Sequence, residues 1–209
     1  MPGKTSFRWP ARSVNLPPRL SSLGRMNTLA SWGEQLARAL LHEPLPRRWA
    51  HVQGVAARAR GLAPVLGADA DLLEAAAWLH DIGYAPGLAT TGLHQLDGAR
   101  YLREAQHADA MLCRLVAHHS CAIVEAGERG LADALGLEFE PAPQELSDAL
   151  TYCDMTTSPH GELVPVEQRL AEIHDRYGPG HLVSRSMQRA TPIILRAVEQ
   201  VHQRAAQTT

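Results

Sequence analysis

The sequence predicts a single all-α domain, and three observations lead to this fold class. The chain has 209 residues, 45% of them hydrophobic and 20% charged, which is the composition of a globular domain with a sizeable core. From residue 28 onward the apolar residues recur at helical spacing. No segment shows the alternation of polar and apolar residues that is typical of a half-buried strand.

Helices are expected at 29–42, 46–66, 70–82, 94–106, 108–119, 143–157, 165–177 and 181–205. Residues with known preferences for helix ends support these limits. Thr28 can cap the first helix, and Pro46 suits the first turn of the second. Asp69 or Asp71 can cap the third, and Gly136 marks a break. The pattern therefore predicts a bundle of helices packed around one core.

Residues 1–26 differ from the rest of the chain. This segment contains no acidic residue, four prolines, and the basic residues Lys4, Arg8, Arg12, Arg19 and Arg25. It lacks the apolar stretch of a secretory signal. We therefore expect a disordered basic tail at 1–26, followed by one helical domain at 27–209.

Composition excludes several classes of function. The net charge of −2 argues against a polymeric nucleic acid as partner, and the absence of any apolar run of about 20 residues argues against a membrane span. Cys113, Cys121 and Cys153 form no Cys-x-x-Cys motif, so a reduced cytoplasmic protein is expected. The helix expected at 181–205 is interpreted as a packing helix or the interface of a homodimer.

The stretch His80-Asp81 ends a wholly apolar helical run that begins at Ala75. A carboxylate at the end of a buried helix costs free energy unless it is paired or binds a metal ion. Four other expected helices also bring histidine or aspartate to, or beside, their core-facing surface. These candidates are His51, His94, His118, His119 and Asp154.

A single buried histidine usually has an ordinary hydrogen-bond partner, but this set would need a separate partner for each member. One shared divalent cation satisfies them together, and helix bundles build metal sites in this way. The mixture of imidazole and carboxylate predicts Mn, Fe, Co, Ni or Zn, as one ion or two. At 100° per residue, His119 falls near the centre of the apolar stripe of helix 108–119 and His118 at its edge.

The order of these residues along the chain, over about residues 45–155, resembles the HD superfamily of metal-dependent phosphohydrolases. Four of them, His51, His80, Asp81 and Asp154, are similar to the set that holds one ion in that superfamily. The resemblance implies a helical HD domain and a site that hydrolyses phosphate esters.

His94 and His118 or His119 resemble the additional ligands of the binuclear branches, so the resemblance implies that they would hold a second ion together with the shared aspartate. The sequence departs from the family pattern in three respects. Tyr84 occupies the position of a lysine that many phosphohydrolase relatives carry, and no Gly-Tyr-Pro triplet of the cyclic-dinucleotide branch follows the histidine pair. Arg47 stands where a glutamate for a third metal would be.

The resulting hypothesis is a phosphohydrolase or phosphodiesterase that hydrolyses a small phosphate ester or nucleotide through a metal-activated water. Asp81 and His80 are the expected catalytic residues. Arg48, Arg58 and Tyr84 are the expected substrate-binding residues, the two arginines because they share one ridge of helix 46–66 and guanidinium groups bind phosphate. Both arginines could instead be solvated surface residues, and the tyrosine could simply pack.

Two other functions remain open from the sequence. A di-iron oxygenase of the HD type would use the same ligands, and the missing lysine favours it slightly. A non-catalytic metal-binding protein, in which the metal is structural or the pocket only senses a ligand, is the second alternative, although structural metal sites usually need fewer residues.

Overall fold

The computed structural model describes residues 28–208, so the tail predicted at 1–26 lies outside the described residues. Within 28–208 the regular elements are helices, and the β pairing is an isolated bridge between Thr157 and Leu163. The predicted all-α fold is therefore confirmed.

The structure sets the helix bounds as follows. The α-helices are α1 (Leu29–Leu41), α2 (Pro46–Gly61), α3 (Ala63–Leu66), α4 (Ala70–Leu79), α5 (His94–Tyr101), α6 (Ala110–His118), α7 (Ala122–Glu128), α8 (Ala132–Glu138), α9 (Gln144–Met155), α10 (Val166–Tyr177) and α11 (Leu182–Thr208). The short turns are the 3-10 turns η2 (Gly67–Asp69), η3 (Ile82–Tyr84) and η5 (His119–Cys121), and the π turn η4 (Leu102–Gln106).

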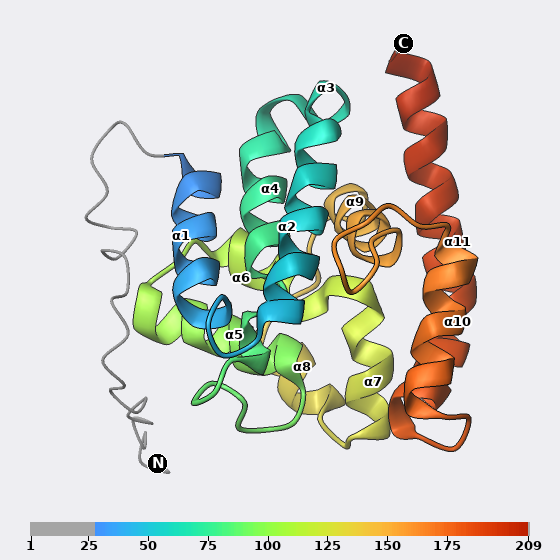
Figure 1. The fold of residues 1–209 in the computed structure, drawn as a ribbon. Coiled ribbons are helices and arrows are strands. Elements are labelled where there is room, and N and C mark those ends of the chain that lie inside the picture. The colour runs from blue at the N-terminus through green and yellow to red at the C-terminus, as the bar shows by residue number, and fades with distance from the viewer. Residues whose placement is uncertain (1–27, 209) are drawn as a thin grey trace.

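The helices surround a large core and a smaller second one. Helices α1, α2 and α4 lie side by side, and α10 and α11 run along the opposite side of the molecule (Figure 1). The large core is built on α1, α2, α4, α5, α6 and α9, and includes Trp32, Leu79 and Leu150. The smaller core joins α10 to α11 through Leu170, Ile173 and other apolar side chains. This second core fixes α10 beside the helices that carry the candidate ligands.

Two expected helices end earlier than predicted. The helix expected at 46–66 breaks at Leu62, because Pro64 in the first turn of α3 has no N–H to continue the helix. The helix expected at 70–82 ends at Leu79, so His80 and Asp81 lie on the turn between α4 and η3. His80 keeps helical dihedral angles as the C-cap of α4, and the backbone leaves the helix at Asp81, where ψ is 7°.

Helices α7 and α8 were not predicted from the sequence, and the predicted break at Gly136 is wrong because Gly136 lies inside α8. Both helices have seven residues, and Leu135 is the one residue of α8 that is buried. Helix α7 buries Ala122, Glu125 and Ala126, but like α8 it spans only two turns, which is too short for a periodic apolar pattern to be recognised.

Capping differs from the prediction in one case. Thr28 caps α1 as expected, with its Oγ1 accepting from the Ser31 N–H at 3.1 Å. Asp71 does not cap its own helix. Its carboxylate accepts from the N–H groups of Leu29 and Ala30 at 2.9 and 3.1 Å, and so caps α1 from α4. Asp69 makes no side-chain cap bond.

Among the described residues, no helix combines the length and the apolar character needed to cross a bilayer. Cys113, Cys121 and Cys153 are free thiols. Helix α11 exposes Ile193 and Leu195, and a homodimer formed through it remains a prediction.

A close backbone contact locks α2 against the loop after α9. Gly54 faces Gly161, and a Cβ at position 54 would lie 2.3 Å from the Gly161 carbonyl oxygen. Gly161 has φ +84°, a conformation that favours glycine. The same loop contains Ser158, whose carbonyl lies 3.0 Å from Nδ1 of His51. The glycine contact therefore positions a candidate ligand.

We predict that Gly54→Ala lowers the free energy of unfolding by about 1–3 kcal/mol, because the added methyl group collides with backbone that cannot rotate away. The matched control is Gly136→Ala in α8, where a Cβ meets no atom within 4 Å. That change should stabilise the protein by up to about 1 kcal/mol through helix propensity. Urea denaturation of the three proteins checks both values, and equal stability of the two variants would contradict the prediction.

Candidate metal centre

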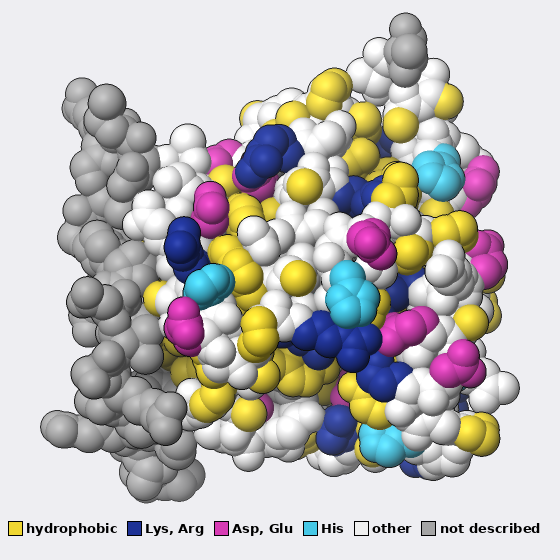
Figure 2. Space-filling view, in the orientation of Figure 1, with side chains coloured by type: hydrophobic (Ala, Val, Ile, Leu, Met, Phe, Trp, Pro, Cys, Tyr) yellow, Lys and Arg dark blue, Asp and Glu magenta, His cyan; other side chains and the backbone are white. Residues whose placement is uncertain are grey.

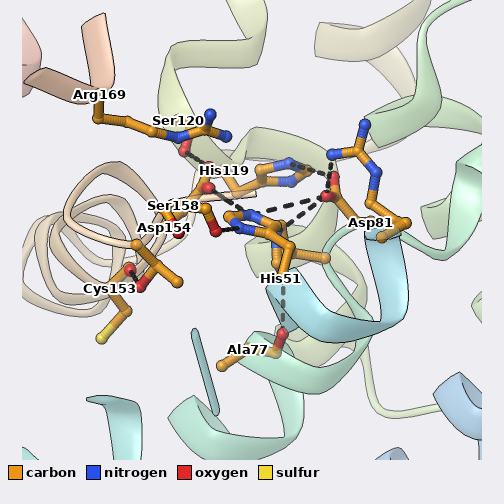
Figure 3. Close-up of polar contacts among 12 residues, drawn as sticks. His51, Ala77, Asp81, His119, Ser120, Cys153, Asp154, Ser158 and Arg169 are labelled. Carbon is orange, nitrogen blue, oxygen red and sulfur yellow. Dashed lines mark hydrogen bonds and ion pairs between the residues drawn. The ribbon is translucent and has the colours of Figure 1, made fainter. Parts of the chain in front are cut away.

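Three histidines are fixed by backbone carbonyls so that Nε2 of each faces one interior point. The Nδ1 distances are 3.0 Å from His51 to the Ser158 oxygen, 2.8 Å from His80 to the Ala77 oxygen, and 2.7 Å from His119 to the Val116 oxygen. A ring that donates through Nδ1 keeps the lone pair of its neutral form on Nε2. Figure 3 shows the rings of His51 and His119 turned toward Asp81 and Asp154. This is the arrangement of metal-binding imidazoles.

The two carboxylate oxygens of Asp81 face two different pairs of histidines. Oδ2 lies 3.4 Å from Nε2 of His80 and 3.9 Å from Nε2 of His51. Oδ1 lies 3.2 Å from Nε2 of His94 and 3.9 Å from Nε2 of His119. Asp81 is therefore placed to serve as a ligand shared between two positions.

Asp154 from α9 stands beside the first pair. Its Oδ1 is 2.9 Å from Nε2 of His51 and 3.9 Å from Nε2 of His80. Its Oδ2 accepts a hydrogen bond from the Ser120 hydroxyl at 2.5 Å. The hydroxyl orients the carboxylate, which leaves Oδ1 directed at the histidines (Figure 3).

Two features of these side chains fit a bound cation. Nε2 of His80 is fully buried and has no hydrogen-bond partner. The Nε2 atoms of His94 and His119 lie 3.2 Å apart in the interior. Two imidazole lone pairs directed at each other repel unless a proton or a cation lies between them.

The ligand atoms form compact sets. In each of three groups, they lie within 4.8 Å of one another: His51, His80 and Asp81; His80, His119 and Asp154; and Asp81, His94 and His119. The first set, with Asp154 beside it, and the third set correspond to the two predicted metal positions. The structure therefore brings together six of the seven predicted ligands, including both aspartates.

The two aspartates are ionised. Burial alone would raise the pKa of the Asp81 carboxyl, but the Arg48 guanidinium, 2.5 Å from Oδ2, and His80 hold that pKa well below its ordinary value. Burial is likewise outweighed at Asp154, whose pKa is lowered by the hydrogen bond from His51 and the charge on His80. The site thus presents two negative charges in a buried position.

The histidines respond to burial differently. Burial lowers the pKa of His119 to about 3, and the nearby His80 and His94 add to this effect. Burial also acts to lower the pKa of His80, but the carboxylate of Asp81 outweighs it and raises that pKa. His119 is therefore neutral at pH 7, with its Nε2 lone pair free to bind an ion.

Two predicted residues lie apart from the centre. Nε2 of His118 is 2.7 Å from the Phe139 carbonyl oxygen, so this ring is directed to the segment after α8. Arg58 bonds the hydroxyl of Tyr152 at 3.3 Å, and ten residues of helix separate it from Arg48, about 15 Å along the axis of α2. His118 is therefore not among the clustered ligands, and Arg58 is not among the residues that line the pocket over them. Both expectations are corrected.

A pocket with a cavity volume of about 70 Å³ opens over the centre, and four of its lining residues are the candidate ligands Asp81, His94, His119 and Asp154. Tyr84 lines it too, with its ring stacked on His94 at a centroid distance of 4.0 Å.

Two further residues of this pocket were missed from the sequence. Arg169 and Arg176 on α10 both line it. Their spacing of seven residues places them on one face of α10 together with Ile173. The spacing alone does not show that this face lies over the candidate metal centre.

We predict that His119→Ala weakens divalent metal binding by at least about tenfold, because the change removes a neutral imidazole from the cluster. His118→Ala is the matched control, one residue away, and should change the metal dissociation constant by less than about twofold because its ring bonds a carbonyl outside the cluster. Titration against a chelating dye measures both constants. A larger loss from His118→Ala would contradict the assignment.

Comparison with known proteins agrees with this geometry. The family model of the HD domain matches residues 48–178. Over 136 residues the chain is 29% identical to a protein named Ribonuclease Y from Thermoanaerobacter pseudethanolicus, which covers 64% of this chain and 24% of that protein. The chain thus spans about a quarter of that relative's length. No solved structure matches. The matched region contains every clustered ligand, and the chain belongs to the HD domain family.

Proposed function

We propose that this protein is a metal-dependent phosphohydrolase or phosphodiesterase that acts on a small phosphate ester or nucleotide. The observation that carries the proposal is the position of Asp81, with one oxygen toward each pair of histidines at the base of a pocket lined by arginines. Membership of the HD family and the name of the Ribonuclease Y relative support hydrolysis of a phosphate bond.

The candidate ligands fit one or two divalent ions of Mn, Fe, Co, Ni or Zn, and such an ion, when bound, lowers the pKa of a water and neutralises phosphoryl oxygens. Asp81 and His80 are the proposed catalytic residues, as ligands from one turn. Asp154, oriented by Ser120, completes the set on the side of His51.

Arg48 supplies positive charge where the sequence lacks the lysine of many relatives. Its guanidinium lies over the ring of Tyr84, 4.0 Å from the centroid, and lines the pocket beside Asp81. Burial raises the pKa of Tyr84 further above its ordinary value, so the phenol keeps its proton and its O–H can donate a hydrogen bond to a phosphoryl oxygen. We propose these two residues as the substrate contacts nearest to the ligands.

The partner that we propose is a small phosphorylated molecule and not a polymeric nucleic acid, since the cavity over the centre is only about 70 Å³ and the chain is slightly acidic. The name of the relative makes an RNA oligonucleotide a necessary member of any substrate panel. A cytoplasmic location is proposed from the three free thiols.

We predict that Asp81→Ala lowers metal-stimulated release of phosphate by at least about 100-fold, because it removes the ligand that both sets of histidines share. The assay measures inorganic phosphate from nucleotides and sugar phosphates with each candidate metal. Asp133→Ala, at an exposed position in α8, is the matched control and should retain wild-type turnover. Circular dichroism verifies that both variants are folded. Wild-type turnover in folded Asp81→Ala protein would remove this mechanism.

The same samples separate the other functions. Two bound irons with oxygen consumption and no phosphate release would favour the di-iron oxygenase. Tightly bound metal with no turnover in either assay would favour a sensor. Cleavage of the RNA oligonucleotide alone would replace the small-molecule substrate with a polymeric one.

A further inference from the structure

The pocket over the candidate metal centre adjoins another pocket. A second pocket, with a cavity volume of about 320 Å³, is also lined by Arg48, Arg169 and Arg176, together with His51 and Arg47. Figure 2 shows dark blue side chains gathered near the centre of this face, between the start of α2 and α10. The three shared arginines therefore stand between the metal centre and an outer pocket.

The charged side chains that line the outer pocket are all positive. Four arginines line it, and its other lining residues are His51 and apolar residues, with no carboxylate among them. Its walls include Pro44, Pro46 and Pro159, whose rings hold the backbone rigid. A rigid pocket with this charge is suited to an anion.

A buried hydrogen-bond donor of Arg169 indicates independently that this region binds a ligand. The residue is 6% exposed, and its Nε has no hydrogen-bond partner. A buried donor without a partner costs about 1–3 kcal/mol, so such groups are usually met by a ligand or water. Figure 3 shows Arg169 extending from α10 toward the ligands. Gln95, in the inner pocket, has a buried Oε1 that also lacks a partner.

The carboxylate of one residue, Glu172, forms ion pairs with three of the arginines. Glu172 lies 2.5 Å from Nη1 of Arg169, 2.8 Å from Nε of Arg176 and 3.8 Å from Nη2 of Arg47. Three guanidinium groups and one carboxylate leave two positive charges at the outer pocket. Arg48 is paired with Asp81 on the inner side. A single phosphoryl group at the metal centre would leave the outer charges without an anion.

We propose that Arg47, Arg169 and Arg176 form a subsite for a second phosphoryl group, so that the substrate carries a diphosphate. The inference rests on the proposed function, since the first phosphoryl group is the one at the metal centre. Arginine is suited to this role because its planar guanidinium binds phosphate oxygens in pairs. Arg169 lies between the two groups and contacts both, while Arg47 and Arg176 hold the outer one.

The test measures binding without catalysis. Inorganic pyrophosphate and orthophosphate are titrated by calorimetry into metal-free full-length protein at constant ionic strength. We expect pyrophosphate to bind at least about tenfold more tightly than orthophosphate, because it reaches both ends of the arginine group. Without a metal the two ionised aspartates repel anions from the inner position, so both anions depend on the arginines. Arg47→Ala and Arg176→Ala should each weaken pyrophosphate binding by at least about fivefold, and should weaken orthophosphate binding too.

Arg114→Ala is the matched control, since this arginine contacts the backbone of Glu140 and Pro141 and lines neither pocket. It should bind pyrophosphate like the wild type. Arg169→Lys, which keeps the charge at a buried position, should weaken pyrophosphate binding because lysine cannot make the paired contact. Circular dichroism verifies that every variant is folded.

Equal affinity for the two anions, or wild-type pyrophosphate binding by both Arg47→Ala and Arg176→Ala, would overturn the subsite. This failure can be distinguished from failure of the proposed function. Pyrophosphate binding without phosphate release under any metal keeps the subsite and removes the hydrolase. Hydrolysis of monophosphates without a preference for pyrophosphate keeps the hydrolase and removes the subsite.

Discussion

The structure depends on one buried carboxylate, that of Asp81, which is 3% exposed and surrounded by four imidazoles and a guanidinium. An ionised group at this depth is tolerated only with charged or hydrogen-bonding partners. The fold supplies them from separate helices that must pack closely. Gly83 shows how closely these helices must pack, because a Cβ there would lie 1.9 Å from the carbonyl oxygen of His94. The approach of α5 to the turn of Asp81 thus requires a residue without a side chain.

Two of the candidate metal ligands, His80 and His119, are positioned by the ends of helices and not by their faces. His80 and His119 each follow the last residues of a helix, and each directs Nδ1 to the carbonyl three residues earlier, at Ala77 and Val116. The last carbonyls of a helix lack partners within it, so the ring satisfies a group that would otherwise be unpaired. The same bond turns Nε2 toward the interior. One local interaction therefore serves both the helix and the site.

Sequence reasoning predicted the all-α fold and the six clustered ligands because long apolar stripes and residue order are both visible in one chain. It placed His119 correctly at the core side, although the helix ends at His118 and η5 begins at His119 itself. His118 was kept as a candidate because a helical wheel cannot show that its ring bonds the Phe139 carbonyl. Arg169 and Arg176 were missed because their role arises from tertiary packing: the small second core brings α10 to the pocket. Spacing on one helix carries no information about what another helix places opposite it.

The account rests on Asp81 being shared between two cations. Anomalous diffraction from crystals grown with manganese or cobalt tests this most directly, because it locates the ions without any assay of activity. We expect two peaks, one beside Oδ2 among His51, His80 and Asp154, and one beside Oδ1 between His94 and His119. Crystals that show a single peak at Asp81, or no peak there at all, would contradict the account.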